Sequence, residues 1–266
     1  MLLPLVGRNI AYDLVGPENG PVVAFSHSLA ADLGMWAEQV PAVLGQGYRA
    51  LRIDMRGHGG SEAAAGDYTL HDLAGDIVAV LDALQIPRVH FLGLSIGGMI
   101  GEALAIRHPS RVTSLFLCES PPASLVNAKA IWAPRMNAAR AAYSLEPITE
   151  ATMERWLTPA FKARNPIRWR QIRDTVAATT VEGYCGCVAA LSHFDFTHEL
   201  PKLAVPALVL YGEDDKASSH EETQRLAALI PGGRFMGFAN ARHLPNVEEP
   251  DRFNRILLDW LARVAA

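Results

Sequence analysis

Short apolar runs rich in β-branched and aromatic residues alternate with helical patterns along most of this 266-residue chain. Such alternation predicts a mostly parallel sheet covered by helices on both faces, with functional sites at the C-terminal ends of the strands. The clearest helix is expected from Leu70 to Leu84, because Thr69 and Asp72 are placed to form a capping box. The strands are expected at 22–26, 48–54, 88–94, 112–119, 207–212 and 234–239.

The alternation of strands and helices is interrupted once, between residues 121 and 195. This stretch contains helix-like segments rich in Ala, Arg and Trp but no convincing strand, and prolines bound it on both sides. We therefore predict an α/β core formed by residues 1–120 and 196–266. The helical insertion at 121–195 is expected to cover the strand ends as a lid.

Ser95 stands in the segment HFLGLSIGGMI, where an expected strand meets an expected helix. Gly93 and Gly97 flank it in the pattern G-x-S-x-G. A nucleophile on so sharp a turn has strained backbone dihedrals and close neighbours on both sides, where a Cβ would collide. The turn exposes the hydroxyl, and the amides that begin the next helix favour developing negative charge there. Ser95 is the predicted catalytic nucleophile, and the Ile96 N–H is a predicted oxyanion donor.

A serine nucleophile needs a histidine base and a carboxylate that orients this base, and on this type of sheet they follow in the order serine, acid, histidine. Asp215 lies in the loop after the expected strand at 207–212. Of the nine histidines, only His243 lies late in the chain next to a strand terminus. We predict Asp215 as the acid and His243 as the base, with Asp214 and Glu119 as alternatives for the acid.

A second oxyanion donor is expected in the loop SHSLAADLGMW, which follows the strand at 22–26. Leu29 is the candidate because of its position in this loop. Its backbone N–H and that of Ile96 could together hold the oxyanion of a tetrahedral intermediate.

Composition argues against several other classes of protein. The 28 acidic and 24 basic residues give a net charge of -4, with no basic cluster to follow a nucleic-acid backbone. The opening MLLPLVG becomes polar too soon for a signal peptide, and no later segment approaches spanning length, so we expect a soluble, cytoplasmic protein without a membrane partner. Cys118, Cys185 and Cys187 are too few for a disulfide framework and poorly arranged for zinc, so we expect reduced, buried thiols and no metal. Both a monomer and a homo-oligomer are compatible with this composition.

Four segments together resemble the α/β-hydrolase superfamily over essentially the whole chain. They are GLSIG at 93–97, the GEDD loop at 212–215, the Arg-His pair at 242–243 and DMRGHGGS at 54–61. Within the last segment, residues 56–61 are interpreted as a structural loop beside the pocket. More narrowly, SHSLAADLGMW, GLSIGGMIG, IWAPR and ARHLPNVE are similar to the 3-oxoadipate enol-lactonase group. The resemblance implies an α/β-hydrolase fold: a mostly parallel central sheet flanked by helices, with a helical lid.

The same resemblance implies a Ser-Asp-His triad. Carried onto this chain, its members are Ser95, Asp215 and His243, and the oxyanion residues are Leu29 and Ile96.

The substrate depends on residues outside the triad. Arg135, in the IWAPR segment of the insertion, could bind a substrate carboxylate through two parallel hydrogen bonds while Trp132 walls the ring. Arginine and tryptophan on amphipathic helices also commonly just cover apolar surface. The chain departs from many relatives at His27-Ser28, where they have His-Gly, and at Ala30, where Gly is common. These changes crowd the oxyanion loop.

These observations predict a serine hydrolase of a small ester or lactone that needs no cofactor, in particular one acting on 3-oxoadipate enol-lactone or a similar carboxylate-bearing lactone through an acyl-enzyme. A general carboxylesterase, a carbon-carbon bond hydrolase of aromatic catabolism or a perhydrolase would use the same triad. Dehalogenase and epoxide hydrolase chemistry on this fold needs a carboxylate nucleophile, whereas position 95 is serine. A small-molecule receptor is the non-enzymatic alternative.

Overall fold

The computed structural model describes residues 1–265 and contains an eight-stranded sheet in the order β1-β2-β4-β3-β5-β6-β7-β8. The strands are β1 (Leu2–Leu5), β2 (Arg8–Val15), β3 (Val22–Ser26), β4 (Arg49–Ile53), β5 (Val89–Leu94), β6 (Val112–Cys118), β7 (Ala207–Gly212) and β8 (Arg234–Phe238). The first two are antiparallel to their neighbours, and β3 to β8 are parallel. The predicted parallel strands are thus confirmed, each boundary within about one residue of the expected one.

The β1–β2 hairpin at the sheet edge was not among the predicted strands. Its register pairs Leu5 with Arg8, so that Val6 and Gly7 form the turn, and Gly7 has a φ of +76°. Pro4 lies inside β1, where its missing N–H is tolerated because the strand is at the edge of the sheet. A proline within a short, partly exposed run weakens the strand signal.

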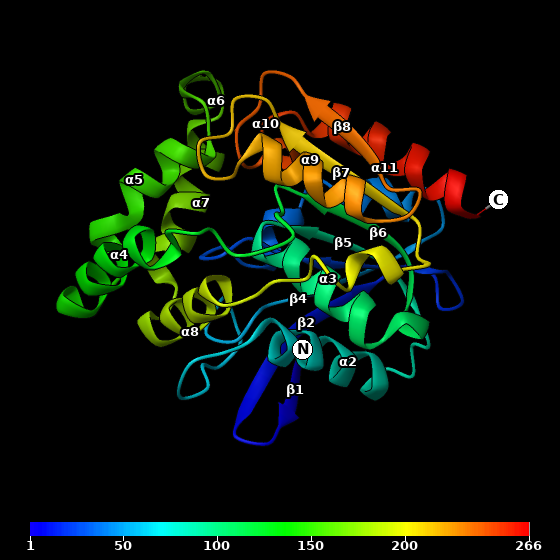
Figure 1. The fold of residues 1–266 in the computed structure, drawn as a ribbon, viewed down its shortest axis with the longest axis horizontal. Coiled ribbons are helices and arrows are strands. Elements are labelled where there is room, and N and C mark those ends of the chain that lie inside the picture. Colours follow the sequence, from blue (N-terminus) through cyan, green and yellow to red (C-terminus); the bar gives the residue numbers. More distant parts are fainter. Residues whose placement is uncertain (266) are drawn as a thin grey trace.

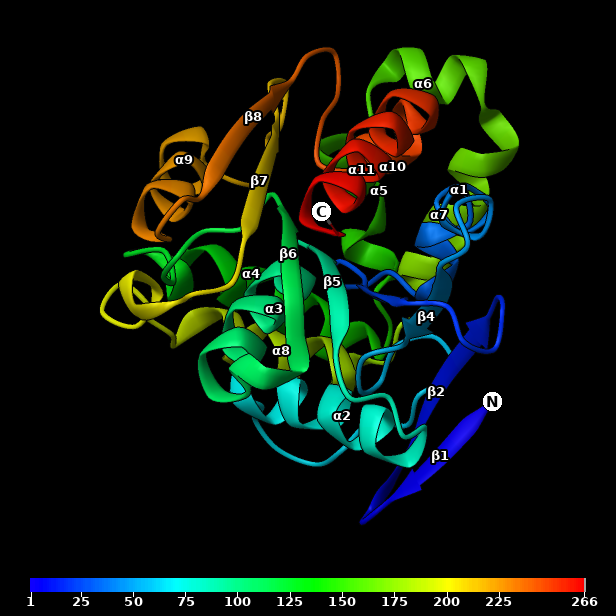
Figure 2. The ribbon, with the colours of Figure 1, turned by 90° about the vertical axis from the view of Figure 1, so that its right-hand side faces the viewer.

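Helices cover both faces of the sheet, as the alternation predicts. Figure 2 shows α2, α3 and α9 on one face, with α1, α10 and α11 on the other. The helix α2 begins with the predicted capping box, in which Asp72 N–H donates to Thr69 Oγ1 at 3.1 Å and Thr69 N–H donates to Asp72 Oδ2 at 2.9 Å. These helices span Val40–Leu44 (α1), Leu70–Ala83 (α2), Ile96–Arg107 (α3), His220–Leu229 (α9), Pro245–Glu248 (α10) and Pro250–Ala265 (α11).

The core runs through the middle of the sheet. β3, β5 and β7 are buried at every position, which is typical of parallel strands covered on both faces. Cys118, Cys185 and Cys187 are buried and free, as expected. Within residues 1–265, no helix has both the length and the apolar character needed to cross a bilayer.

Between β6 and β7 the chain forms the helical insertion, residues 121–195. In Figure 1 its helices lie together beyond one end of the strands. An isolated antiparallel bridge pairs Ala123 with Asp195 and so joins the two ends of the insertion. That the insertion acts as a lid stays a prediction. Its helices are α4 (Ala128–Ala142), α5 (Glu146–Trp156), α6 (Pro159–Arg164), α7 (Pro166–Ala178) and α8 (Val181–Ser192).

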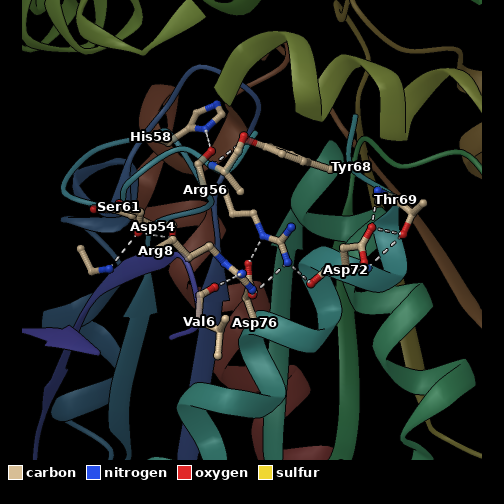
Figure 3. Close-up of polar contacts among 12 residues, drawn as sticks. Val6, Arg8, Asp54, Arg56, His58, Ser61, Tyr68, Thr69, Asp72 and Asp76 are labelled. Atoms are coloured by element: carbon tan, nitrogen blue, oxygen red, sulfur yellow. Dashed lines mark hydrogen bonds and ion pairs between the residues drawn. The ribbon is translucent and has the colours of Figure 1, made fainter. Parts of the chain in front are cut away.

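The loop at 54–61 is tied to the core by a charged cluster, shown in Figure 3. The Arg56 guanidinium donates to both carboxylate oxygens of Asp76 on α2, at 2.5 Å through Nε and 3.1 Å through Nη2. Arg8 at the start of β2 donates to the same carboxylate. Paired and mostly buried, these charges hold the loop against α2 and the sheet edge.

The loop also contacts the insertion through two glycines. Thr180, the N-cap residue of α8, donates to the Gly57 carbonyl through both its N–H and its hydroxyl, at 3.2 and 2.9 Å. A Cβ on Gly57 would lie 2.4 Å from the Cα of Gly183. Gly57 also has a φ of +71°, which favours glycine. The close approach of α8 to the core thus requires glycine at position 57.

We therefore expect Gly57→Ala to lower the free energy of unfolding by about 2 kcal/mol or more, from backbone strain and overpacking together. Gly232→Ala is the matched control, because Gly232 has a φ of +70° but no atom within 4 Å of an added Cβ. Urea denaturation of both variants measures the difference that the α8 contact causes. Equal losses in the two variants would contradict this explanation.

Candidate active site

Ser95 occupies the tight turn between β5 and α3, with φ 58° and ψ -123°. The predicted strain is therefore present. A Cβ on Gly93 would lie 2.2 Å from the Gly97 carbonyl oxygen, and one on Gly97 would lie 2.2 Å from that of Ser26. Both flanking positions thus require glycine because other backbone segments pass so close. Within residues 1–265 the Ser95 hydroxyl has no hydrogen-bond partner, and Ser95 lines a cavity.

Asp215 and His243 lie together at the same edge of the sheet, in the loops after β7 and β8. The His243 Nδ1–H donates to Asp215 Oδ2 at 2.9 Å, and both side chains are almost completely buried. Burial alone would raise the pKa of Asp215, but the charge and hydrogen bond of His243, together with the neighbouring Glu119 carboxyl and Ser218 hydroxyl groups, lower it to about 2. The low pKa favours the carboxylate form of Asp215, which accepts from His243 Nδ1 and leaves Nε2 free. The roles of Asp215 as the acid and His243 as the base remain predictions.

Of the two alternatives for the acid, one is separated from His243 and the other lies close to it. Asp214 is exposed, and its backbone N–H donates to Ala241 O. Glu119, directly after β6, is buried, and a carboxylate oxygen of it lies within 4.8 Å of ligand atoms of both Asp215 and His243. The structure thus pairs Asp215 with His243 and places a second carboxyl beside the pair.

The two predicted oxyanion residues flank Ser95 from different elements. Ile96 is the first residue of α3, where the helix leaves the backbone N–H without an intrahelical acceptor. Leu29 lies in the loop after β3 and lines the cavity. Among the described residues neither N–H has an assigned acceptor, so both stay available as donors. Their role in holding an oxyanion remains a prediction.

His27 supports the loop after β3 that contains Leu29, a role that the sequence analysis did not find. Its Nε2 accepts from the Met55 N–H at 3.0 Å, so Nδ1 carries the hydrogen and donates to the Ser28 carbonyl at 2.8 Å. Next to it, Ala30 adopts a φ of 61°, in the left-handed region that glycine prefers. The departure from glycine at this position is therefore accommodated at the cost of local backbone strain.

The cavity has a volume of about 280 Å³ and lies between the strand ends and the helical insertion. Its core-side wall includes Ser28, Leu29, Ser95, Glu119 and His243. None of residues 54–61 lines it, in agreement with a structural role for that loop. On the insertion side the lining residues include Ile131, Trp132, Arg135, Thr152, Arg155, Trp156 and Tyr184.

Two guanidinium groups face the cavity from different helices. Arg135 on α4 stacks over the Trp132 ring, 4.8 Å from its centroid. Arg155 on α5 donates to Thr152 Oγ1 at 3.1 Å, and within residues 1–265 neither arginine has a carboxylate within 4.0 Å. Burial lowers the pKa of Arg155, and the nearby charge of Arg135 lowers it further. The cavity thus holds two close guanidinium groups, and among residues 1–265 neither forms a direct ion pair, although the charges of Asp215 and Glu154 partly offset the lowering of the Arg155 pKa.

Arg155 and Trp156 are functional candidates that the sequence analysis missed. The indole of Trp156 stacks on the His243 ring, with centroids 6.1 Å apart and planes 25° from parallel. Arg155 and Trp156 are adjacent in α5. Their sequence signal is an arginine close to a tryptophan within the insertion, as in IWAPR, where Trp132 and Arg135 are three residues apart. Helical periodicity cannot assign such a pair to the cavity, because it does not specify how α5 docks on the core.

Comparison with known proteins agrees with the observed fold. Residues 21–250 match the family model described as alpha/beta hydrolase fold. The chain is 32% identical to 3-oxoadipate enol-lactonase 2 of Acinetobacter baylyi, over 94% of this chain and 92% of that protein. It is also 32% identical to a putative carbamate hydrolase, RutD, of Variovorax paradoxus, over 96% and 97% of the two chains. The crystal structure of the enol-lactonase from Burkholderia xenovorans superposes with a TM-score of 0.93 at 36% identity, over 98% of this chain and 100% of that one.

Proposed function

This chain belongs to the α/β-hydrolase family, and we propose that it is a serine hydrolase that opens a carboxylate-bearing lactone, 3-oxoadipate enol-lactone or a close analogue. The similarity to enol-lactonases supports the reaction class. Fold and family alone do not determine the substrate, so the proposal depends on the cavity.

The observation that carries the proposal is the pair of guanidinium groups opposite Ser95. Arg135 and Arg155 line the same cavity as the serine and lie close enough for one to depress the pKa of the other. The acidic residue in that lining is Glu119, whose pKa is raised well above its usual range by burial and by Asp215, which favours its neutral form. A substrate carboxylate would relieve this repulsion and accept charge-assisted hydrogen bonds from either arginine.

In the proposed mechanism, His243 Nε2 takes the proton of the Ser95 hydroxyl as its oxygen attacks the lactone carbonyl. Asp215 holds the tautomer and stabilises the imidazolium. The amides of Leu29 and Ile96 donate to the oxyanion. When the intermediate collapses, the ring C–O bond breaks and the enol oxygen leaves, while remaining tethered to the acyl chain.

Water then completes the reaction. His243 gives its proton to the enolate leaving group and afterwards takes one from a water molecule that attacks the acyl-enzyme. Breakage of the Ser95 ester bond releases the open-chain acid and restores the hydroxyl. These side chains and amides supply every proton transfer and charge that the reaction needs, so we propose a mechanism without a cofactor.

Hydrolysis of a carbamate is a second candidate, favoured by the similarity to the putative carbamate hydrolase RutD. The same serine and oxyanion donors would serve this reaction. A substrate without a carboxylate, however, would leave both arginines unpaired. A carbamate without a carboxylate therefore differs from the lactone, because it does not need the positive charges of Arg135 and Arg155.

The test is a comparison of kcat/KM for 3-oxoadipate enol-lactone, a neutral aryl acetate and a simple carbamate. We expect the lactone to be preferred by about 100-fold, because one charge-assisted pair contributes about 1.5–3 kcal/mol. Preference for the carbamate would favour the second candidate. Equal rates on ester and lactone would keep the serine chemistry but reject the carboxylate-bearing substrate.

A further inference from the structure

A second carboxyl group, that of Glu119, lies beside the proposed triad and has no role in the mechanism above. Its side chain is buried at the end of β6, where the Gly212 N–H at the end of β7 donates to Oε1. Its other oxygen, Oε2, lies 2.9 Å from Ser218 Oγ. The same Ser218 hydroxyl contacts Asp215 Oδ2, which also accepts from His243. Glu119, Ser218, Asp215 and His243 therefore form a continuous hydrogen-bonded chain.

This row of hydrogen bonds needs a proton on one of its two carboxyl groups, that of Glu119 or that of Asp215. The Ser218 hydroxyl has one hydrogen, so it can donate to only one of its carboxyl neighbours. Asp215 receives hydrogen bonds from His243 Nδ1 at 2.9 Å and from the Ala217 N–H at 2.7 Å, which favour its anion. The remaining arrangement has Glu119 protonated and donating to Ser218, whose hydroxyl in turn donates to Asp215.

The electrostatics of the site agree with this arrangement. Burial raises the pKa of Glu119 well above its usual range, and the negative charge of Asp215 raises it further. Two carboxyl groups this close in a buried site do not both ionise. Burial also raises the pKa of Cys118 and that of Tyr211, the latter to about 12, so neither neighbour supplies a negative charge.

We propose that Glu119 is a reserve acid for the triad: a protonated positioning residue that supports Asp215 and takes over its negative charge when position 215 is neutral. The proposal depends on the serine mechanism described above. If Asp215 loses its charge, Glu119 can release its proton to water in the cavity that it lines. The resulting carboxylate would lie within 4.8 Å of a His243 ring nitrogen, close enough to stabilise the imidazolium.

The test is a double-mutant cycle with Asp215→Asn, Glu119→Gln and the two combined. Loss of a triad acid alone typically lowers kcat about 10⁴-fold. With Glu119 in reserve, we expect Asp215→Asn to lower kcat only about 10²-fold and the double variant about 10⁴-fold, with KM nearly constant in both. Glu119→Gln should cost about threefold, because its amide can still donate to Ser218. Asp214→Asn, a change at the exposed neighbouring residue, is the matched control and should match the wild type.

Two kinetic results would overturn the proposal. One is an Asp215→Asn variant as impaired as the double variant, and the other is a Glu119→Gln variant as impaired as Asp215→Asn. Ser95→Ala separates this test from that of the proposed function. If Ser95→Ala stays active, the serine mechanism is wrong; if it is inactive and the cycle shows no reserve, only the role of Glu119 is wrong.

Infrared difference spectra report the proton directly and do not depend on turnover. The spectrum of the wild type minus Glu119→Gln should contain the carbonyl stretch of a neutral carboxylic acid. The same band should be absent when the spectrum of the double variant is subtracted from that of Asp215→Asn, because Glu119 is then ionised. Absence of the band from the wild type would overturn the proposal even if Asp215→Asn failed to fold.

Discussion

Replacing Ser95 with alanine is expected to lower kcat by about 10⁴-fold or more on every ester or lactone that the protein hydrolyses. The alanine side chain has no nucleophile, while the turn, the oxyanion amides and the arginines stay in place. Substrate binding and the free energy of unfolding should therefore change little. His243→Gln should have a comparable effect on kcat, because the serine then lacks its base.

Steady-state rates and labelling with a serine-reactive phosphonate probe measure this effect. The wild type should be labelled at Ser95, and Ser95→Ala should not be labelled. Ser110→Ala, at an exposed position before β6, is the control and should behave as the wild type. Rapid hydrolysis by Ser95→Ala would exclude the acyl-enzyme mechanism, whereas absence of turnover by the wild type would favour a small-molecule receptor.

The second large effect is expected from Arg155→Met, which removes the charge but keeps an apolar side chain of similar length. KM for the carboxylate-bearing lactone should rise about 10- to 100-fold, because a charge-assisted hydrogen bond to a carboxylate is worth about 1.5–3 kcal/mol. KM for a neutral aryl acetate should change less than about threefold, because that substrate has no anion to bind. Arg135→Met should show the same selectivity if both guanidinium groups contact the carboxylate.

Michaelis-Menten parameters on both substrates test this prediction. Arg170→Met is the control, because Arg170 is exposed on α7 and does not line the cavity. If Arg155→Met raised KM equally for the lactone and the neutral ester, the arginine would have a packing role. The substrate proposal would then lose the observation on which it depends.

The parallel strands and the turn at Ser95 could be predicted because their requirements lie within neighbouring residues. A strand covered on both faces needs a continuous apolar run, and the turn needs glycine at positions 93 and 97, where other backbone atoms lie 2.2 Å from any Cβ. The β1–β2 hairpin had a weaker signal because Pro4 interrupts its short, partly exposed first strand.

The choice of the acid shows where local pattern stops being sufficient. Asp214 and Asp215 are adjacent in the same loop, yet one is exposed and the other lies 2.9 Å from His243. Glu119, which also follows a strand, lies beside Asp215 in a way that only the pairing of β6 with β7 decides. Strand-end position therefore identified the candidates, and the loop conformation separated them.

By itself the sequence determined the α/β architecture, the place of the helical insertion and the tight turn that holds the predicted nucleophile, because each follows from periodicity or from a turn that few residues can form. The tertiary structure alone decided that Arg155 faces the cavity with Arg135, and that Glu119 and Asp215 share the Ser218 hydroxyl. These groups come from separate helices and strands. Their contacts depend on how the insertion docks on the core and how neighbouring strands align, and no local sequence pattern encodes either.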